Sequence, residues 1–339
     1  METSIIIETL IKMVVVVLIF SALAGFGTYF ERRLLGFFHR RLGPNMVGPF
    51  GLLQIIADGI KLFTKEDIIP ANAVKGIFVF ATLVIPVAAF VAFTAIPLYP
   101  QFTVFGYTVH PIIIDVNVGL LFVMGVMAVG MYTPLLAGMS SGNKWSLIGA
   151  ARGVIQLLSF EVITGLSILA PLMMVGSLSL IDINQYQVDS GMWLIVQQPV
   201  AFILFTIAGF AEVNRTPFDL TENESEIIAG YHTEYSGMKY GLMAIGEYAS
   251  MFIVAFLVSI IFLGGYGDAS AIVNGEQNGA WGGVFLLLKV AFFFFFFIWT
   301  RATWPHIRPD QLMWLCWKVL MPLAVLNIVI TGFVMMLNQ

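Results

Sequence analysis

Apolar stretches long enough to cross a lipid bilayer recur along the whole chain. A helix needs about 20 consecutive apolar residues to span the hydrocarbon core, and eight segments reach this length. They cover approximately residues 5–29, 73–98, 116–137, 146–175, 192–211, 240–263, 281–299 and 312–337. Inside lipid, helices satisfy their own backbone hydrogen bonds. The pattern therefore predicts an all-α, polytopic membrane protein with about eight transmembrane helices.

The composition also indicates that lipid, and not water, surrounds most of this chain. Charged residues make up 11% of it and hydrophobic residues 59%, whereas a soluble domain has about 25% charged residues. The mean hydropathy is +0.92. Because the apolar runs continue to the end, we expect one membrane domain, residues 1–339. The first run lacks the basic start and the cleavage site of a signal peptide, so we expect it to remain as a membrane helix.

Charge and cysteine content argue against several kinds of partner. The formal net charge is −4 and the Lys and Arg residues form no large block, so we expect no nucleic-acid partner. The one cysteine, Cys316, lies in an apolar stretch. A single thiol cannot hold an iron–sulfur cluster or a structural zinc, and no CxxCH motif for haem is present. We expect no metal site, redox centre or cofactor bound by this chain.

The basic residues predict how the chain is oriented in the membrane. Short cytoplasmic loops are enriched in Lys and Arg, and 13 of the 16 basic residues lie in or beside the loops after the first, third, fifth and seventh spans. These residues are Arg32, Arg33, Arg40, Arg41, Lys61, Lys65, Lys75, Lys144, Arg152, Arg215, Lys239, Arg301 and Arg308. The loops around 99–111, 182–191 and 264–280 carry none. We expect the odd-numbered loops inside and both termini outside.

The first cytoplasmic loop, residues 31–72, contains a candidate amphipathic helix. Its apolar residues recur with helical spacing, and polar residues occupy the opposite face. The apolar residues are Leu53, Ile56, Ile60 and Phe63, and the polar residues are Gln54, Asp58, Lys61 and Lys65. This segment is too short and too charged to span, so we expect it at the membrane interface. The periodicity alone leaves open whether the helix only tethers the loop.

Glu161 is an ionisable residue near the middle of the span at 146–175. A charge at that depth costs about 2.5–3.5 kcal/mol on insertion scales, so it needs a partner, a watery cavity or a function. Arg152 lies on the opposite side of the same helix and cannot pair with it. Glu161 is either a structural hydrogen-bonding group or a carboxyl that exchanges protons. Lys289 and Lys318 raise the same question, although a lysine can extend toward the interface.

The loop at 212–240 is rich in acidic residues that few basic residues offset. Seven of the chain's twenty acids lie within 36 residues, namely Glu212, Asp219, Glu222, Glu224, Glu226, Glu234 and Glu247. Only Arg215 and Lys239 are close to them in sequence. Some of these acids must therefore be protonated, solvated or paired with another loop or subunit. Interspersed apolar residues such as Phe218 and Tyr231 indicate packing and argue against a disordered loop.

The loops and spans carry motifs of a known family. The first loop contains ERRLLG at 31–36, GPN at 43–45, GP at 48–49, GLLQ at 51–54, AD at 57–58 and KLFTKE at 61–66. The acidic loop contains AEVNRTPFDLTENESEI at 211–227, with EY at 234–235 and 247–248. Further motifs are IGAARGVIQ at 148–156, SFEV at 159–162 and RPDQLM at 308–313. Over nearly its whole length the chain resembles the H subunit family of bacterial NADH:quinone oxidoreductase (respiratory complex I), the counterpart of mitochondrial subunit 1.

This resemblance implies a component of a multi-subunit, proton-translocating enzyme. The chain would dock a peripheral arm, form most of the membrane-side wall of a quinone tunnel and couple quinone reduction to proton translocation. It would lie in the bacterial inner membrane, with the other subunits of complex I, quinone and lipid as its partners. FMN and iron–sulfur clusters are expected in the partner subunits.

The resemblance also implies roles for particular residues, none of them catalytic by itself. Positions matching the quinone tunnel are Glu31, Arg32, Arg41, Asp58, Arg215, Asp219 and Glu222. Positions matching an acidic proton path are Glu161, Glu212, Glu224, Glu226, Glu234 and Glu247. A quinone has an apolar tail and a head that takes up two protons on reduction. Coupled carboxylates near that head can respond to its change of charge.

Two alternative functions explain part of the pattern. A membrane subunit of a related energy-converting hydrogenase would share the fold, but the nearly complete motif loop from Glu212 to Glu247 favours the quinone enzymes. A stand-alone ion transporter would explain Glu161 but not the elaborate cytoplasmic loops. Paired broken helices, which are typical of such transporters, are not evident. Ubiquinone and menaquinone fit the sequence equally well, as do direct proton conduction and relay of a coupling signal.

Overall fold

The fold is described from a computed structural model, in which residues 2–99, 102–104, 107–109, 112–113, 116–222, 224–267 and 282–337 are described. Within these residues, seven helical segments are long and apolar enough to cross a membrane. Five are single helices: α1 (Glu2–Phe38), α3 (Lys75–Phe93), α6 (Lys144–Val175), α11 (Gly237–Phe262) and α13 (Gly282–Thr303). The multi-pass helical architecture predicted from the apolar runs is confirmed.

Two of the seven segments consist of consecutive helices. One is α4 (Gly119–Gly130) followed by α5 (Thr133–Ser140), where Pro134 lies in the first turn of α5. The other is α14 (Pro309–Leu315), a π-helical turn η3 (Cys316–Leu320) and α15 (Met321–Leu337). Proline has no backbone N–H to donate and favours a helix start. It therefore explains the break before α5.

The eighth predicted span, at 192–211, is shorter than expected. It forms α8 (Leu194–Gln197) and then α9 (Pro199–Glu212), because Pro199 begins a new helix and the backbone at Gln198 is not helical. The 14 residues of α9 rise by about 21 Å, less than the roughly 30 Å of a hydrocarbon core. Glu212 is consequently the last residue of a helix and does not lie in the following loop.

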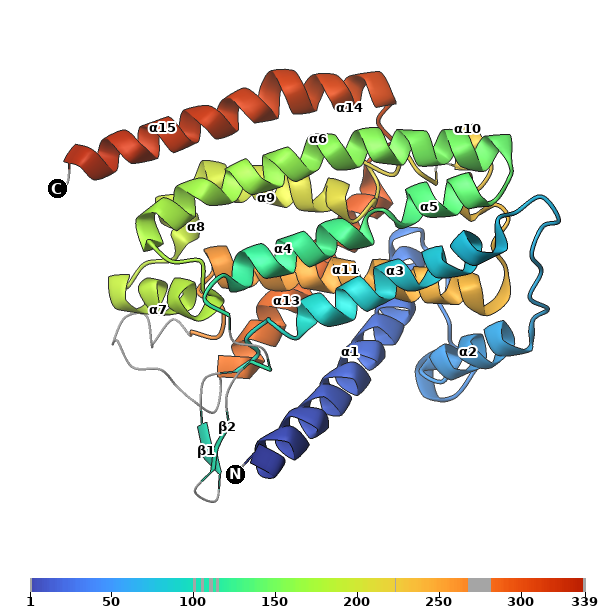
Figure 1. Ribbon diagram of the computed structural model, residues 1–339, viewed down its shortest axis with the longest axis horizontal. Helices are drawn as coiled ribbons and strands as arrows, with labels where there is room; N and C mark the ends of the chain where they lie inside the picture. Colours follow the sequence, from blue (N-terminus) through green and yellow to red (C-terminus); the bar gives the residue numbers. More distant parts are fainter. Residues whose placement is uncertain are drawn as a thin grey trace.

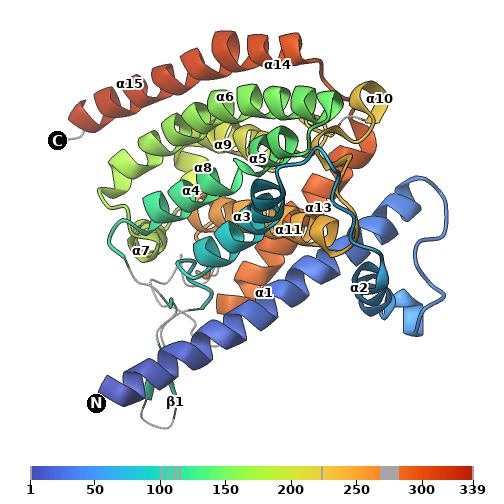
Figure 2. The ribbon, with the colours of Figure 1, turned by 45° about the vertical axis from the view of Figure 1, so that its right-hand side comes forward.

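The central helix of the bundle is α11. It contacts α1, α3, α9 and α13, and the four surround it in Figures 1 and 2. The apolar core forms where they meet, with Phe252 stacked on Phe294 of α13 at a centroid distance of 4.3 Å. On one flank α14 and α15 run along α6 (Figures 1 and 2). Side chains carried by α11 are thus held by several helices at once.

The two predicted cytoplasmic loops are partly helical. α1 continues to Phe38, since Glu, Arg and Leu in this stretch are good helix formers; the loop predicted from residue 31 therefore begins after 38. The amphipathic helix is confirmed as α2 (Gln54–Thr64), preceded by a 3-10 turn η1 (Pro49–Gly51). Its apolar face is uncovered, with Phe63 73% exposed. The acidic loop contains α10 (Glu224–Ile227) and a 3-10 turn η2 (Gly230–His232).

Loops at the opposite end of the bundle add structure that the sequence did not predict. Strands β1 (Phe102–Val104) and β2 (Tyr107–Val109) pair antiparallel, with Phe102 opposite Val109. The loop near 182–191 is a helix, α7 (Leu180–Ser190). The strand pair is a small departure from the all-α expectation and lies outside the membrane helices. Most of the predicted loop at 264–280 lies outside the described residues.

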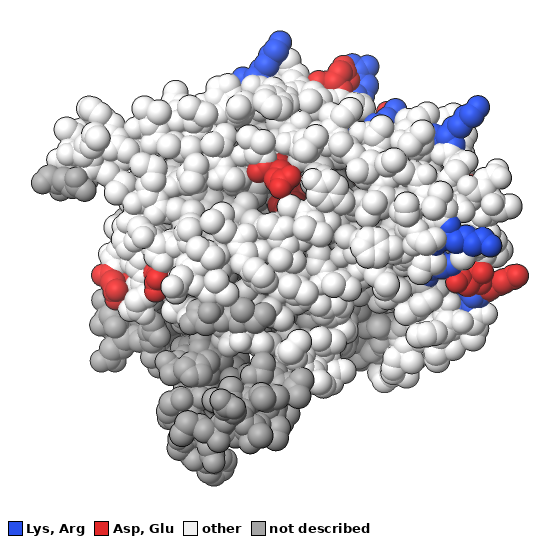
Figure 3. Space-filling view, viewed as in Figure 1, with Lys and Arg blue, Asp and Glu red and all other residues white. Residues whose placement is uncertain are grey.

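Charge is distributed unevenly over the bundle. On the face in Figure 3, Lys and Arg gather at the right-hand end and the upper edge, and the left-hand end shows only acidic groups. The middle of this face is uncharged except for one acidic patch (Figure 3). The two ends therefore differ in the way that the sequence predicts for the two sides of a membrane.

Candidate functional site

Glu31 is a deeply buried carboxylate near the end of α1, with only 4% of its surface exposed. Arg301 of α13 donates a hydrogen bond to its Oε1 atom. Arg215, in the segment after α9, places Nη1 3.6 Å from the same oxygen and Nη2 3.8 Å from Oε2 of Glu247. A buried charge is stable only when it is paired. Three segments that are distant in sequence provide this pairing.

Glu247 of α11 links these arginines to a second group around His232. Tyr231 donates a 2.7 Å hydrogen bond to Oε1 of Glu247. His232 places Nε2 3.2 Å from the same oxygen and also contacts the carboxylate of Glu222. Both rings belong to η2, which starts at Gly230 with φ +53°, where a Cβ atom would lie 1.7 Å from a backbone oxygen. Glycine thus permits the turn that positions Tyr231 and His232.

We call this assembly the buried charged cluster. It comprises Glu31, Arg215, Asp219, Glu222, His232, Glu247 and Arg301. Its residues come from α1, the loop after α9, η2, α11 and α13. The cluster has four carboxylates but only two guanidinium groups and one imidazole. It therefore has the capacity to hold one or more protons in addition to those of the arginines.

Asp219 and His232, which lie in the loop outside the membrane-spanning helices, have strongly altered pKa values. Burial raises the pKa of Asp219, and the neighbouring Glu222 carboxylate adds to the effect, so that the pKa rises from 3.8 to about 7. Burial would lower the pKa of His232, but Glu222 and Glu247 outweigh burial and raise the pKa to about 10. His232 is accordingly a cation at neutral pH, and Asp219 changes charge near neutrality. The second property suits a group that takes up and releases protons.

Arg32 and Asp58 form a separate ion pair, which joins α1 to the interfacial helix α2. Asp58 also accepts a 2.9 Å hydrogen bond from Gln54. Arg32 and Arg41 together line an open, polar cavity of about 360 Å³ beside the GPN turn at 43–45. Three of the charged residues that the resemblance assigns to a quinone tunnel, Arg32, Arg41 and Asp58, thus lie near one another.

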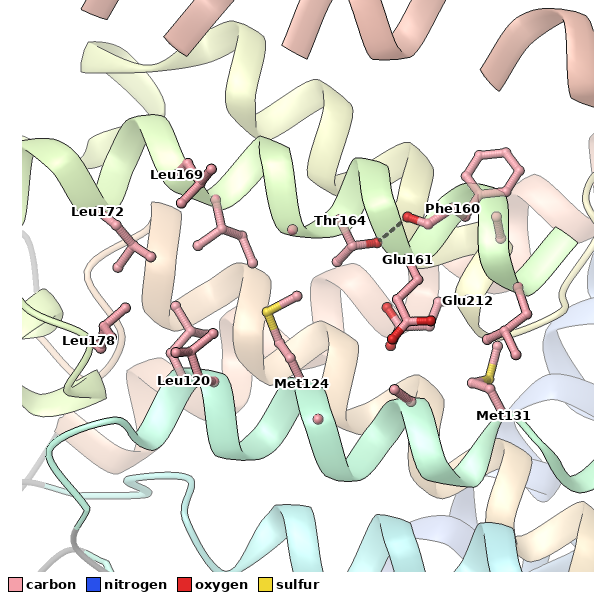
Figure 4. Close-up of a pocket in the computed structure, with 17 residues that line it drawn as sticks. Leu120, Met124, Met131, Phe160, Glu161, Thr164, Leu169, Leu172, Leu178 and Glu212 are labelled. Carbon is pink, nitrogen blue, oxygen red and sulfur yellow. Dashed lines mark hydrogen bonds between the residues drawn. The ribbon is translucent and has the colours of Figure 1, made fainter. Parts of the chain in front are cut away.

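Glu161 and Glu212 line a different cavity, of about 470 Å³, between α4, α6 and α9. Its remaining wall is almost entirely apolar, and Figure 4 shows the two carboxylates directed toward one another at one end. Glu161 lies on the surface of the chain. The ionisable group that faces Glu161 is thus another carboxyl and not a cation. We call this feature the acidic cavity.

The other acids expected along the proton path have partners of their own. Glu226 pairs with Arg152, at the first turns of α6, and Glu234 accepts a 2.8 Å hydrogen bond from Asn143. The side chain of Glu224 lies outside the described residues. The structure therefore brings the expected path residues into separate groups, not into one continuous row.

Comparison with known proteins identifies the family. The model of the NADH dehydrogenase family matches residues 11–332. The chain belongs to the NADH dehydrogenase family. It is 64% identical over 336 residues to the NADH-quinone oxidoreductase H subunit of a Nitratiruptor species, with 99% of both chains covered. It is 64% identical over 340 residues to that of Wolinella succinogenes, covering 99% of this chain and 100% of the relative. The identity to that of Helicobacter hepaticus is 61% over 332 residues, with 98% of both chains covered.

Sequence reasoning assigned no functional role to four residues of the buried charged cluster and its contacts, namely Tyr231, His232, Tyr248 and Arg301. The Arg215 guanidinium packs over the ring of Tyr248, and its Cζ atom lies 4.6 Å from the ring centroid. The sequence places Arg301 only in a basic loop and His232 only within the acidic segment. A signal was present for Arg301, because it directly follows a long apolar span where a charge is costly. No spacing pattern connects His232 to Glu222 and Glu247.

Proposed function

We propose that this chain forms the membrane side of the quinone tunnel in a proton-translocating NADH:quinone oxidoreductase and couples quinone reduction to proton movement. The observation that carries the proposal is the buried charged cluster, in which carboxylates outnumber the permanent cations. The chain would act without a redox centre of its own. Electrons would arrive from FMN and iron–sulfur clusters in partner subunits.

The tunnel would begin at the interfacial helix. The exposed apolar face of α2 suits the level of the lipid headgroups, and the Arg32–Asp58 pair fixes α2 against α1. One residue before Arg32 along α1, Glu31 enters the buried charged cluster. A quinone entering beside α2 would therefore travel from an apolar surface toward carboxylates and arginines. In this arrangement the lipid-soluble tail would lie at the apolar entrance. The head, which must be protonated, would lie beside the carboxylates and arginines.

The coupling would use carboxylates that sense each other's charge. Reduction of the quinone head requires two protons, and Asp219, with a pKa of about 7, can supply one near neutral pH. Loss of that proton adds a negative charge beside Glu222, Glu247 and Arg215. This charge changes how strongly the other groups of the cluster hold their protons. We propose that Glu212 and Glu161 continue this response toward the membrane interior, where their cavity opens on the surface of the bundle.

We further propose the setting in which this activity occurs. The chain would lie in the bacterial inner membrane with the Lys- and Arg-rich end in the cytoplasm and both termini outside. The peripheral arm would dock on that cytoplasmic end, and other membrane subunits would cover the side that carries Glu161. The named relatives, all subunits of NADH-quinone oxidoreductases, support the quinone enzyme over a hydrogenase or a stand-alone transporter.

The proposal is tested by Glu247→Gln in the complete enzyme complex. Glutamine keeps the shape of the side chain but removes the negative charge that faces Arg215 and His232, so the cluster can no longer respond as one coupled unit. We expect quinone-linked NADH oxidation to fall by about tenfold or more. Electron transfer from NADH to an artificial acceptor should be unchanged, because it does not use this chain.

Glu226→Gln is the matched control, since it changes an acid of the same loop that pairs with Arg152 at the surface. It should retain most of the quinone-linked activity. Full quinone-linked activity in an assembled Glu247→Gln complex would show that Glu247 has only a structural role, and the coupling proposal would be wrong.

A further inference from the structure

Three side chains with metal-binding chemistry converge within the buried charged cluster. Glu222, His232 and Glu247 each offer one ligand atom, and these atoms all lie within 4.8 Å of one another. They come from a loop, from η2 and from α11, so the fold and not their spacing in sequence brings them together. We propose that Glu222, His232 and Glu247 form a binding site for one divalent cation of the zinc type.

The donor set fits such a cation. Zinc accepts imidazole nitrogen and carboxylate oxygen at about 2.0–2.2 Å, which places tetrahedral ligands about 3.3 Å apart. The Nε2 atom of His232 and the Oε1 atom of Glu247 are 3.2 Å apart, close to that separation. Three protein ligands leave a fourth position for water. An imidazole among the ligands favours zinc over magnesium or calcium, which prefer oxygen donors alone.

The surroundings of the three residues supply a second observation. His232 is 7% exposed, and its other ring nitrogen, Nδ1, is buried without a hydrogen-bond partner among the described residues. The Oδ1 atom of Asp219 is buried without a partner as well. Nδ1 lies on the ring edge away from the ligand nitrogen and does not face the ion, so the unsatisfied Asp219 oxygen is the polar atom left for the surroundings of the site. Tyr231 meanwhile orients the Glu247 carboxylate through its 2.7 Å hydrogen bond, as residues behind metal ligands commonly do.

The charge of the cluster also fits a divalent cation. Four carboxylates, those of Glu31, Asp219, Glu222 and Glu247, surround the guanidinium groups of Arg215 and Arg301. With a neutral imidazole, which ligation of a metal requires, and with Asp219 ionised, as it is above its pKa of about 7, these groups carry two uncompensated negative charges. One divalent cation neutralises them. This site departs from our expectation of no metal site, which rested on the single cysteine.

A bound cation would have a consequence that rests on the proposed function. It would hold Glu222 and Glu247 in one arrangement, so that they could no longer respond to a change of charge at Asp219. Quinone-linked turnover should then stop while electron transfer from NADH to an artificial acceptor continues. Zinc binding and zinc inhibition are thus separate measurements. Binding tests whether the metal site exists, and inhibition tests whether its residues take part in the proposed coupling.

The test compares the purified complex with its His232→Asn and His306→Asn variants. His306 is an exposed histidine, so its replacement controls for zinc held at the surface. Each complex is treated with a chelator, titrated with Zn²⁺, passed over a sizing column and assayed for zinc. We expect the wild type and His306→Asn to retain one more zinc per complex than His232→Asn. The zinc K-edge absorption spectrum of that ion should show only nitrogen and oxygen ligands, with a single imidazole.

Inhibition is measured on the same samples. The zinc concentration that halves quinone-linked turnover should rise at least tenfold in His232→Asn and stay unchanged in His306→Asn. If His232→Asn does not assemble, Glu222→Gln provides the same comparison, because it removes a different ligand.

The possible results separate the two proposals. Equal zinc content in wild type and ligand variants, or sulfur ligation of the extra ion, overturns the site and leaves the three residues as an ion triad. Zinc that binds at His232 without slowing turnover supports the site but contradicts the proposed coupling of Glu222 and Glu247 to Asp219.

Discussion

Glu31 and Arg32 are adjacent in α1, but Glu31 is buried and Arg32 is exposed. The two residues therefore contact different parts of the site. Glu31 points into the bundle and is almost fully buried, whereas the side chain of Arg32 is 53% exposed. Successive residues of a helix are about 100° apart around its axis, so the two face different neighbours. Glu31 meets Arg215 and Arg301, and Arg32 meets Asp58. A single turn of helix thus joins the Arg32–Asp58 pair to the buried charged cluster.

Asp219 should make part of the enzyme's proton uptake depend on pH near neutrality. Its pKa is raised to about 7, so it carries a proton below that pH and a negative charge above it. In the unfolded chain the residue would ionise near 3.8. Between these values the folded state binds a proton that the unfolded state releases. The contribution of Asp219 to stability is therefore lost as the pH rises toward 7.

Infrared titration of the purified complex measures this group directly. A band from a protonated carboxyl should disappear as the pH rises through about 7, and it should be absent from Asp219→Asn. Asp310→Asn, which changes an exposed aspartate, should retain the band. A band that persists in Asp219→Asn would assign the titration to another residue.

At the residue scale, sequence reasoning identified acids better than bases. Glu161 was recognisable because charge within an apolar span is costly. The acid-rich loop was recognisable by its composition, and Asp58 by its position on the polar face of an amphipathic helix. Their partners were not, because Arg301 lies 270 residues from Glu31 and no local pattern links them. The closeness of Glu161 to Glu212 in one cavity was hidden for the same reason. It depends on how α6 packs against α9.

At the scale of helices, the interfacial helix gives a sharp prediction. Asp58→Asn removes the charge that pairs α2 with Arg32, so α2 should be positioned less accurately at the tunnel mouth. The pair is partly exposed and adds little to stability, at most about 1 kcal/mol. We expect a several-fold loss of quinone-linked turnover with normal assembly and normal electron transfer to an artificial acceptor. Equal loss of both activities would indicate failed assembly and would contradict this role.

Lys289 has a structural explanation at the same scale. Its ammonium group donates hydrogen bonds of 2.8–2.9 Å to the backbone oxygens of Leu263, Gly265 and Gly267, which follow the end of α11. Lys289→Met should leave these oxygens without that donor and destabilise the protein by about 2 kcal/mol. The complex should unfold at a lower temperature, with normal turnover per assembled complex.

Lys318→Met is the control for that substitution, because Lys318 is exposed at the surface of the bundle. It should not change the unfolding temperature. If both variants unfold like the wild type, the capping of α11 by Lys289 contributes nothing measurable.

The membrane helices were largely predictable, and their boundaries were less so. Apolar length alone located the spans, since lipid requires it. The extension of α1 to Phe38 was missed because its last turns are charged, although charged residues continue a helix readily. The break at Pro199 shortened α9 below membrane length. The strand pair β1–β2 is too short to leave a period-2 pattern that could be distinguished from a turn.

At the scale of the whole molecule, the account places charge in two connected locations. One is the buried charged cluster at the Lys- and Arg-rich end, and the other is the acidic cavity on the side of the bundle. They are joined through α9 and the loop that follows it, because Glu212 ends α9 and Arg215 begins the pairing with Glu31. If quinone chemistry drives proton movement, a substitution at Glu161 must also change the protonation of the buried charged cluster, and with it quinone-linked turnover.

The most direct measurement is therefore made on Glu161→Gln in sealed membrane vesicles, with quinone-linked NADH oxidation and proton pumping recorded together. Glutamine preserves the size and hydrogen-bonding capacity of the side chain but cannot release a proton. Asp182→Asn, an exposed acid at the opposite end of the bundle, is the control and should behave like the wild type. We predict that the Glu161→Gln complex assembles and that both turnover and pumping fall. Normal turnover together with normal pumping would contradict the account and leave Glu161 as a structural hydrogen-bonding group.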